Sequence, residues 1–250
     1  MNTCPGTGPR GAWDETNFQR QQAKIVGAIN KIDADIISVE EIENSRVVDG
    51  AGVDRDEALA ALVTALNAAA GAGTWDYVRS PASASTDANV ALQDVIRTGF
   101  IYKPAKVEVV GAADMLFGTS EFDNAREPFA SVFKPKGATD ASKFAVIVNH
   151  FKSKGSGAND GTGQGNANPD RINQATRLAQ YADDFAAARG VSAVFLTGDF
   201  NSYSQEDPMQ VLYGKGYSQA RGGGQALLQT STASPARSTT CSPTPPPRRS

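Results

Sequence analysis

Three apolar segments of the sequence end in residues that could carry out hydrolytic chemistry. These residues lie at or shortly after the end of an apolar run, and they are Glu40, Glu41, Asn149, His150, Asp199 and Asn201. The runs, at residues 36–39, 145–148 and 193–196, are typical of short buried strands. Because a rigid sheet holds the side chains at its strand ends while the adjoining loops open to solvent, we expect these residues to form one site.

The types of these side chains point to a metal ion and a phosphate. A hard divalent cation takes oxygen ligands, which Glu41, Asp199 and Asn201 can supply. His150 can donate a hydrogen bond to a phosphate or stabilise developing negative charge. Taken singly, each residue has a simpler interpretation, because a glutamate after a strand is often solvated, a lone histidine is often structural, and Asp-Phe-Asn can be a turn. Only the combination indicates a hydrolytic site.

Basic residues lie close to these positions in the sequence. Lys152 and Lys154 follow His150, and Arg126 precedes a predicted strand. Each of the three can be a solvated loop residue or a contact to a phosphate beside the site. The residues alone leave both interpretations open.

Residues 155–165 are rich in glycine and lie between a predicted strand and a predicted helix, where a dinucleotide-binding loop would lie. Their spacing does not fit G-x-G-x-x-G, and the sequence has no G-x-x-x-x-G-K-[ST] motif. A flexible surface loop is the better interpretation, with a dinucleotide-binding domain as a distant alternative.

The composition of the 250 residues, 40% hydrophobic and 20% charged, predicts one globular domain. The net charge of −3 excludes a broadly basic surface, so any contact with nucleic acid must be local. No apolar run approaches the roughly 18 residues of a membrane span, and residues 1–13 do not have the pattern of a signal peptide. Cys4 and Cys241 are too few for a disulfide framework or a four-cysteine zinc site.

Helices and strands must alternate to position the candidate residues. Periodicity predicts helices at residues 17–32, 56–69, 169–188 and 207–213. In the first helix Phe18, Ile25, Ile29 and Ile32 share the apolar face. Strands are predicted at residues 35–40, 75–79, 94–102, 107–111, 129–133, 143–150 and 192–197. We expect the third and fourth strands, and likewise the fifth and sixth, to form hairpins, which favours an α/β arrangement of mixed sheets with helices outside.

Taken together, these stretches resemble the endonuclease/exonuclease/phosphatase superfamily, and within it the bacterial extracellular nuclease branch related to deoxyribonuclease I. The resemblance covers residues 17–217. Four motifs in family order carry it, and they are Asp33-Ala-Asp-Ile-Ile-Ser-Val-Glu-Glu-Ile-Glu-Asn44, Asp94-Val-Ile-Arg-Thr-Gly-Phe-Ile-Tyr-Lys-Pro104, Val148-Asn-His-Phe-Lys-Ser-Lys154 and Thr197-Gly-Asp-Phe-Asn201 followed by Glu206-Asp-Pro208.

The resemblance implies a four-layered α/β/β/α sandwich of two mixed sheets and the hydrolysis of phosphodiesters with Mg²⁺, or with Mn²⁺ or Ca²⁺ in its place. Carried over by position, Glu41 and Asp199 are metal ligands. His150 contacts the scissile phosphate, Asp199 activates the attacking water, and Asn201 holds the phosphate or that aspartate. The implied substrate contacts are Arg126, Asn149, Lys152 and Asn201.

The resemblance also implies a member truncated at both ends. The family's first strand and its later Ser-Leu-Asp-His and Ser-Asp-His-Pro segments, with the second aspartate and the main catalytic histidine, have no counterpart here. We expect a domain at residues 1–218 without its first and last strands, followed by a disordered tail at residues 219–250. If GC-rich codons are chosen for residues 232–246 and are read two bases later, they can encode Ser-Leu-Asp-His. We therefore expect that the segment after Tyr217 is translated out of frame.

Three functions therefore stay open. The first is a metal-dependent endonuclease-type phosphodiesterase that hydrolyses nucleic acid, DNA rather than RNA. The second is a catalytically inactive remnant, because the single histidine leaves the main catalytic position of the family unfilled. The third is a phosphatase or a sphingomyelinase-type hydrolase on the same fold. We expect a monomer without a membrane span, from a family whose members are mostly secreted.

Overall fold

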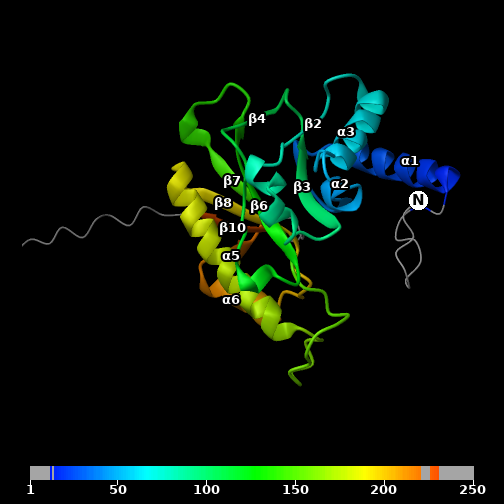
Figure 1. Cartoon of the computed structure of the whole chain (residues 1–250). Coiled ribbons are helices and arrows are strands. Elements are labelled where there is room, and N and C mark those ends of the chain that lie inside the picture. Colours follow the sequence, from blue (N-terminus) through cyan, green and yellow to red (C-terminus); the bar gives the residue numbers. More distant parts are fainter. Residues whose placement is uncertain (1–11, 13, 221–225, 231–250) are drawn as a thin grey trace, which may run out of the picture.

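Two sheets packed face to face, each covered by helices on its outer side, form the part of the chain that the computed structural model describes, residues 12, 14–220 and 226–230 (Figure 1). The helices are α1 (Glu15–Ile32), α2 (Ser45–Val48), α3 (Glu57–Ala70), α4 (Asp87–Val90), α5 (Asn168–Arg189) and α6 (Asp207–Gly214). The strands are β1 (Ile36–Glu43), β2 (Asp76–Tyr77), β3 (Ile96–Tyr102), β4 (Val107–Val109), β5 (Asp114–Met115), β6 (Arg126–Pro135), β7 (Phe144–His150), β8 (Ala193–Asp199), β9 (Ser218–Gln219) and β10 (Ala226–Thr230).

The smaller sheet has the strand order β1-β3-β2 and is antiparallel in the described residues. The larger sheet has the order β4-β6-β7-β8-β10-β9, with β5 paired to β6. In it β7 and β8 run parallel, and the long helix α5 connects them across the outer face. The prediction of an α/β fold with two sheets is confirmed, although only the larger sheet is mixed.

Three apolar clusters separate four layers. Phe100 of β3 packs between the sheets against Phe129 and Phe133 of β6, with ring centroids 5.6 and 5.7 Å apart. A second cluster lies between the larger sheet and the helices α5 and α6, and a third lies between the smaller sheet and the helices α1 and α3. Figure 1 shows these two helix pairs on opposite sides of the strands. The layer order is therefore the predicted α/β/β/α.

The predicted hairpin of residues 94–102 and 107–111 is wrong. Both segments are strands, but β3 pairs with β1 and β2 in the smaller sheet, whereas β4 pairs with β6 in the larger one. Pro104 lies in the turn between them, where it has no N–H to continue a ladder. The chain crosses from one sheet to the other at this turn. The second predicted hairpin, β6 with β7, is confirmed.

Helix α1 is confirmed, but its predicted buried face is only partly right. Its N-cap, Asp14, accepts a hydrogen bond of 2.7 Å from the backbone N–H of Asn17. Val26 and Ile29 are the buried residues of the helix. The expected partners of Ile29 are exposed instead, and they are Phe18, Ile25 and Ile32. The helix meets the small sheet along one edge of its apolar stripe, so the other edge faces solvent.

The larger sheet extends into the segment that the composition predicts to be disordered. Strand β10 pairs antiparallel with β8, from Ala226 opposite Thr197 to Thr230 opposite Ala193. The expectation of disorder from residue 219 onward is therefore wrong for this strand. The remainder of the predicted tail, residues 221–225 and 231–250, lies outside the described residues, as do Cys4 and Cys241.

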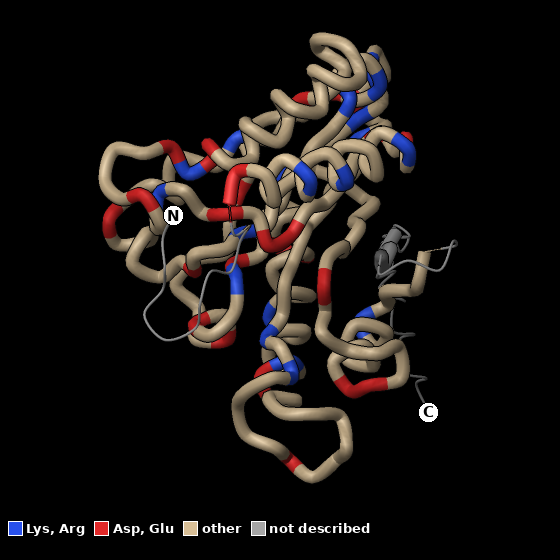
Figure 2. The backbone as a smooth tube through the Cα atoms, turned by 90° about the vertical axis from the view of Figure 1, so that its right-hand side faces the viewer, with Lys and Arg blue, Asp and Glu red and all other residues tan. Residues whose placement is uncertain are grey.

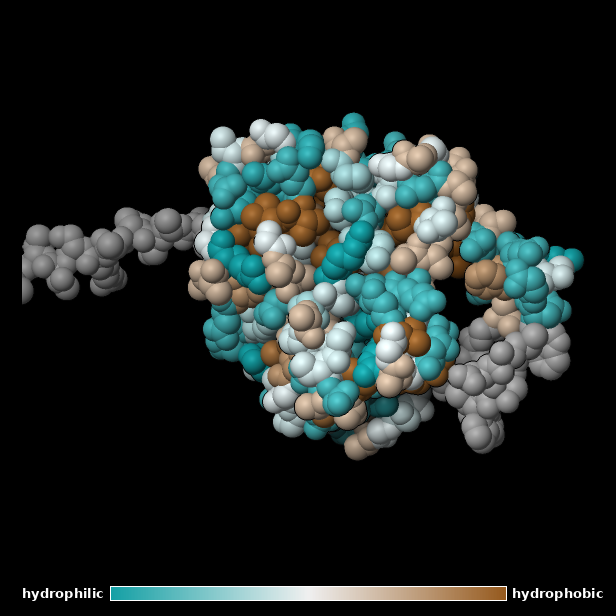
Figure 3. Space-filling model, turned by 45° about the horizontal axis from the view of Figure 1, so that its top comes forward, coloured by the Kyte–Doolittle hydropathy of each residue, from teal (hydrophilic) through white to brown (hydrophobic). Residues whose placement is uncertain are grey.

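The surface of the described residues is mixed in both charge and hydropathy. Lys and Arg alternate with Asp and Glu along the backbone instead of collecting in separate halves (Figure 2). Figure 3 shows apolar residues in the middle of one face, bordered by hydrophilic ones. Within the described part, no helix is both long enough and apolar enough to cross a membrane.

Candidate active site

The candidate residues meet at one edge of the sandwich because of the strand directions. The carboxyl ends of the parallel strands β7 and β8 lie side by side, and the antiparallel β6 begins at the same edge. In the smaller sheet β1 ends where β3 begins, and β1 contacts both β7 and β8. The sequence prediction that three strand ends form one edge is thus supported by the topology.

His150 and Asp199 are register partners at the ends of β7 and β8. The His150 Nε2 lies 3.9 Å from the Asp199 Oδ2, and His150 is 4% exposed. Burial and then the positive charge of Arg126 lower the pKa of His150, against the opposing charges of Asp199 and Glu41. Since this pKa starts from an ordinary value of 6.5, the imidazole is neutral at pH 7 and can donate one hydrogen bond while its other nitrogen accepts.

Gly198 allows the two strands to approach each other next to this pair. Its φ is +117°, and a Cβ at this position would collide with the carbonyl oxygen of Asn149. Asn149 itself is completely buried, and its Nδ2 donates a 2.6 Å hydrogen bond to the Thr197 carbonyl oxygen. Asn149, which was expected to contact substrate, is therefore fully buried at the strand end and bonded to the neighbouring strand.

A tight turn after β8 fixes the Asp199 carboxylate. The backbone N–H of Asn201 donates a 2.8 Å hydrogen bond to the Asp199 Oδ1, and Asn201 has a φ of +47°. The Asn201 Nδ2 donates a 3.0 Å bond to the carbonyl oxygen of Phe151 in the neighbouring loop. The simple turn interpretation and the functional one are compatible, since the turn holds an acidic group beside His150.

A bulge in β1 presents two glutamates differently. The pairing of β1 with β3 shifts register between Val39 and Ile42, and Glu41, which lies in this bulge, has a φ of +55° and is exposed. Glu40 is half-buried and lies beside Asp199. Burial and then the charge of Asp199 raise the pKa of Glu40 to about 7, partly offset by a hydrogen bond from the Asp199 backbone. Both glutamates are candidates by sequence, but only Glu41 has a specific role predicted for it.

The oxygen-rich side chains of this edge fit a divalent cation. Burial and then the nearby Asp199 carboxylate raise the pKa of Glu40, so a cation bound here would favour its ionised form. Mg²⁺ takes oxygen ligands, usually one or two carboxylates together with water and phosphate oxygens. Among the described residues, no group of three His, Cys, Asp or Glu side chains is arranged to hold an ion unaided. An ion at this edge would therefore need further ligands, such as water or phosphate oxygens.

Arg126 brings a positive charge to this edge. It begins β6 opposite His150, and its Nε lies 3.1 Å from the Asp94 Oδ2. Lys152 follows in the loop after β7, where its backbone N–H donates to the Gln174 Oε1 at 2.9 Å. The fold thus brings Arg126 and Lys152 to the same edge as His150. The sequence did not single out Asp94, which orients Arg126 from the start of β3.

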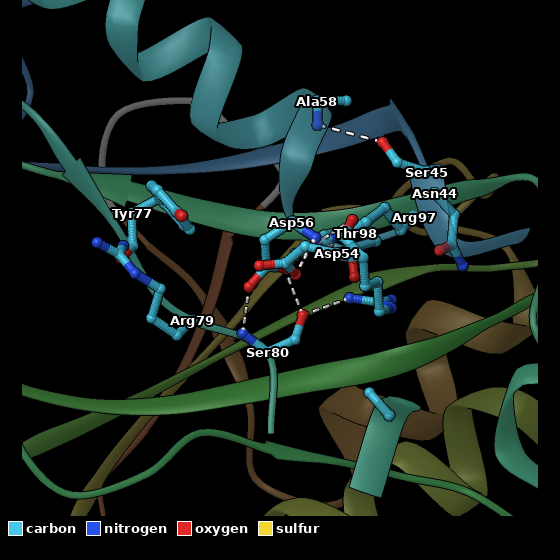
Figure 4. A network of polar contacts seen from close by, with 12 residues as sticks. Asn44, Ser45, Asp54, Asp56, Ala58, Tyr77, Arg79, Ser80, Arg97 and Thr98 are labelled. Atoms are coloured by element: carbon cyan, nitrogen blue, oxygen red, sulfur yellow. Dashed lines mark hydrogen bonds and ion pairs between the residues drawn. The ribbon is translucent and has the colours of Figure 1, made fainter. Parts of the chain in front are cut away.

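A buried polar network joins the start of α3 to β3 and to the loop at Ser80 (Figure 4). Arg97 and Asp56 form an ion pair that is almost fully buried, and Asp56 also accepts from the backbone and hydroxyl of Ser80 at 2.7 and 2.6 Å. Arg55 donates to the Ser80 hydroxyl and to the Gln93 Oε1. The charge of Arg97 and the Ser80 donors outweigh burial, so the pKa of Asp56 is lowered.

One amide joins this network to the active-site edge. The Asn44 Nδ2 donates to the Gln93 Oε1 at 3.0 Å and to the Asp94 carbonyl oxygen at 3.1 Å. Asn44 is 1% exposed and directly follows the end of β1. The position of Arg126 therefore depends on contacts that run through Asp94 into the small sheet.

Comparison with known proteins supports the fold. No protein-family model matches the chain, and no curated protein matches its sequence. Among solved structures, a conserved protein of unknown function from Enterococcus faecalis V583 is 17% identical, with a TM-score of 0.51, over 80% of this chain and 66% of that chain. A mannosyl-6-phosphatase from Bacteroides thetaiotaomicron is 15% identical, with a TM-score of 0.49, over 90% and 83% of the two chains.

A third structure is described as a member of the family that the motifs resemble. This endonuclease/exonuclease/phosphatase family protein from Bacteroides thetaiotaomicron is 16% identical, with a TM-score of 0.46, over 83% of this chain and 64% of that chain. The chain spans less than two thirds of the length of this protein and 66% of the Enterococcus protein. The layers, the sheet order and the first of these matches together show that the chain has the fold of the Enterococcus protein, two packed sheets between helices.

Proposed function

We propose that this protein is a metal-dependent phosphodiesterase that hydrolyses nucleic acid. The observation that carries the proposal is the His150–Asp199 pair, set beside Glu40 and Glu41 with Arg126 opposite it. This set combines cation ligands, a neutral imidazole and a fixed positive charge. The resemblance of its motifs to the nuclease branch supports the choice of nucleic acid as substrate.

Each side chain has a distinct task in this proposal. A bound Mg²⁺ would be held by Glu41 and Asp199 and would supply charge neutralisation at the phosphate. Arg126 binds a phosphate oxygen, and the neutral His150 donates a hydrogen bond to another. Asn201 keeps the Asp199 carboxylate in place, so that Asp199 can accept a proton from the attacking water. As the bond from the water oxygen to phosphorus forms, the bond from phosphorus to the leaving oxygen breaks, and the leaving oxygen takes up a proton from solvent.

Nicking of supercoiled plasmid by the full chain tests this function. We expect Mg²⁺-dependent nicking that EDTA stops and that Asp199→Asn reduces about 10²- to 10⁴-fold. Asp184→Asn is the matched control, since Asp184 is exposed on α5 and accepts a hydrogen bond from Gln180 of its own helix. A folded protein that never nicks DNA or RNA would show that the chain is not a nuclease.

A substrate panel separates the remaining hydrolase functions. Plasmid DNA, single-stranded RNA, a sugar phosphate and sphingomyelin vesicles offer the same phosphate group in different settings. A phosphodiesterase for nucleic acid cleaves the first or second and leaves the others intact. Turnover of the sugar phosphate alone would identify a phosphatase, and turnover of none would identify an inactive protein.

A further inference from the structure

One aromatic side chain at the active-site edge has no role in the chemistry above. The exposed large apolar side chains of the described residues fall into two groups. Phe18, Ile25 and Ile32 lie on α1, whereas Leu92, Val95 and Tyr203 lie in the loops at the active-site edge. Tyr203 is the most exposed of the six at 76%. An exposed ring contributes little to the hydrophobic core, so the stability of the fold does not account for an aromatic residue at this position.

The backbone around Tyr203 is held firmly although the ring is exposed. The Tyr203 N–H donates a 3.1 Å hydrogen bond to the Glu206 Oε2, and the Glu206 N–H donates a 2.9 Å bond back to the Tyr203 carbonyl oxygen. The Lys154 Nζ lies 2.6 and 2.7 Å from the two Glu206 carboxylate oxygens. Tyr203, Glu206 and Lys154 therefore form one unit at the start of α6.

Lys154 also orders the ring. Its Nζ lies 4.5 Å from the Tyr203 ring centroid, a cation–π distance. The exposed fraction shows that most of the ring surface remains free. A ring held from one side and open on the other is suited to stacking, because little conformational freedom is lost when a second flat group binds.

The unit lies next to the proposed phosphate site. Tyr203 is two residues after Asn201, so their Cα atoms are at most about 7.6 Å apart. Lys154 comes from the loop that follows His150 at the end of the neighbouring strand. The Tyr203 backbone therefore lies close to the proposed phosphate site.

We infer that Tyr203 is a stacking platform for a nucleobase beside the scissile phosphate, ordered by Lys154 and Glu206. This inference rests on the proposed function and specifies its substrate as a strand with unpaired bases. Every base offers a flat face to an aromatic ring, so the contact binds single strands with little regard to sequence. Inside a duplex the bases are covered by their neighbours, so the platform favours single-stranded or locally opened substrates.

The test compares oligonucleotides with and without bases. Binding of fluorescein-labelled hexathymidylate and of an abasic oligomer with the same number of phosphates is measured by anisotropy. The full chain with Asp199→Asn is the parent protein of this test, and Mg²⁺ is present, so that substrate binds without being cut. We expect Tyr203→Ala to weaken binding of hexathymidylate about 5- to 100-fold and binding of the abasic oligomer less than about twofold.

Two further variants control for other effects of the substitution. Tyr203→Trp keeps a ring and is expected to bind hexathymidylate as tightly as the parent. Phe18→Ala removes an exposed aromatic on the outer helix α1, and it is expected to change neither affinity. Equal binding of hexathymidylate by the parent and Tyr203→Ala, or an equal loss for both oligomers, would overturn the stacking role.

The same measurements separate this inference from the proposed function. A parent that binds both oligomers equally contradicts the stacking role and leaves the phosphodiesterase proposal standing. A parent that binds neither contradicts both. Base-dependent binding together with an absence of Mg²⁺-dependent nicking by the protein with Asp199 intact would support the platform and reject the nuclease activity.

Discussion

At the scale of single residues, the protonation state of Glu40 would affect the affinity of the candidate site for a cation. Burial and the neighbouring Asp199 carboxylate raise the pKa of Glu40 to about 7. A cation held as proposed by Glu41 and Asp199 would lie close to Glu40, so below this pH its binding would be coupled to loss of the Glu40 proton. If the proposed cation binds here, its affinity should depend on pH through Glu40, to which the sequence assigned no specific role.

This link predicts a pH-dependent affinity for Mn²⁺, which serves as the probe. Between pH 7 and pH 5.5 the affinity should fall, approaching about tenfold per pH unit, because the proton and the ion compete for Glu40. Calorimetric titration of the parent and of Glu40→Gln at pH 5.5, 6.5 and 7.5 measures it. Glu40→Gln should bind more weakly at pH 7.5 and show a flatter profile. The same slope in both proteins would locate the competing proton elsewhere.

Glu41 provides the matched comparison at the neighbouring position. It is exposed and lies in the β1 bulge, and the resemblance makes it a metal ligand. We expect Glu41→Gln to lower Mn²⁺ affinity at all three pH values without changing the slope. If Glu41→Gln leaves the affinity unchanged, Glu40 and not Glu41 is the glutamate ligand.

At the scale of elements, the close approach of β7 and β8 depends on Gly198. Its φ is positive, in a region that favours glycine, and a Cβ would collide with the carbonyl oxygen of Asn149. The two strands would have to separate at the point where His150 and Asp199 face each other. Stability and activity are therefore coupled at this position.

Gly198→Ala tests that coupling. We expect a loss of about 3 kcal/mol or more in the free energy of unfolding, measured by urea denaturation, together with loss of nicking. Gly27→Ala is the control, because Gly27 lies in α1 and a Cβ added there would meet no other atom within 4 Å. It should stabilise the protein by about 0.5–1 kcal/mol. Equal stability of Gly198→Ala and the parent would mean that the strands can separate at little cost.

The buried ion pair of Arg97 and Asp56 ties α3 to the small sheet and to the loop at Ser80 (Figure 4). Removing one partner leaves the other charge buried without compensation. Asp56→Asn is expected to cost about 3–5 kcal/mol in urea denaturation. Asp87→Asn breaks the pair between Arg46 and the fully exposed Asp87 and should leave the midpoint nearly unchanged. A small effect of Asp56→Asn would mean that Ser80 and water can satisfy Arg97.

At the scale of the whole molecule, one buried acid makes folding stability depend on pH. Glu127 is 7% exposed in β6, and burial raises its pKa to about 7 against an ordinary value of 4.5. The folded chain therefore keeps this proton up to about pH 7, whereas the unfolded chain releases it near its ordinary value. Since the folded state binds more protons in this window, stability falls as the pH rises from 4.5 to about 7 and is then level.

Replacing this acid should reduce the slope, and Glu40, whose pKa burial also raises to about 7, supplies part of what remains. The shift of the Glu127 pKa corresponds to at most about 3 kcal/mol over the window. Urea unfolding of the parent and of Glu127→Gln at pH 5, 6, 7 and 8 gives the difference. We expect Glu127→Gln to be relatively more stable above pH 7 than at pH 5. Glu15→Gln, an exposed acid of α1, should follow the parent. Parallel curves for Glu127→Gln and the parent would show that Glu127 is ionised in the folded protein.

The sequence by itself determined the elements and the strand ends that carry polar residues. Apolar runs such as residues 145–148 and the periodicity of α1 and α5 are local signals, so they can be read without knowing the fold. The same runs placed His150 and Asp199 at strand ends, and parallel pairing of β7 and β8 made them neighbours. The motif order indicated the layer arrangement as well.

Only the tertiary structure decided which strands share a sheet and which side chains face the site. β3 and β4 follow each other in the chain but join different sheets, because the turn at Pro104 leads across the sandwich. Side chains alternate between the two faces of a sheet along a strand. A single bulge therefore changes the face on which the residues after it lie. The bulge in β1 set Glu40 beside Asp199, and the register of β7 buried Asn149. Pairing between distant segments fixes these outcomes, and local sequence does not contain it.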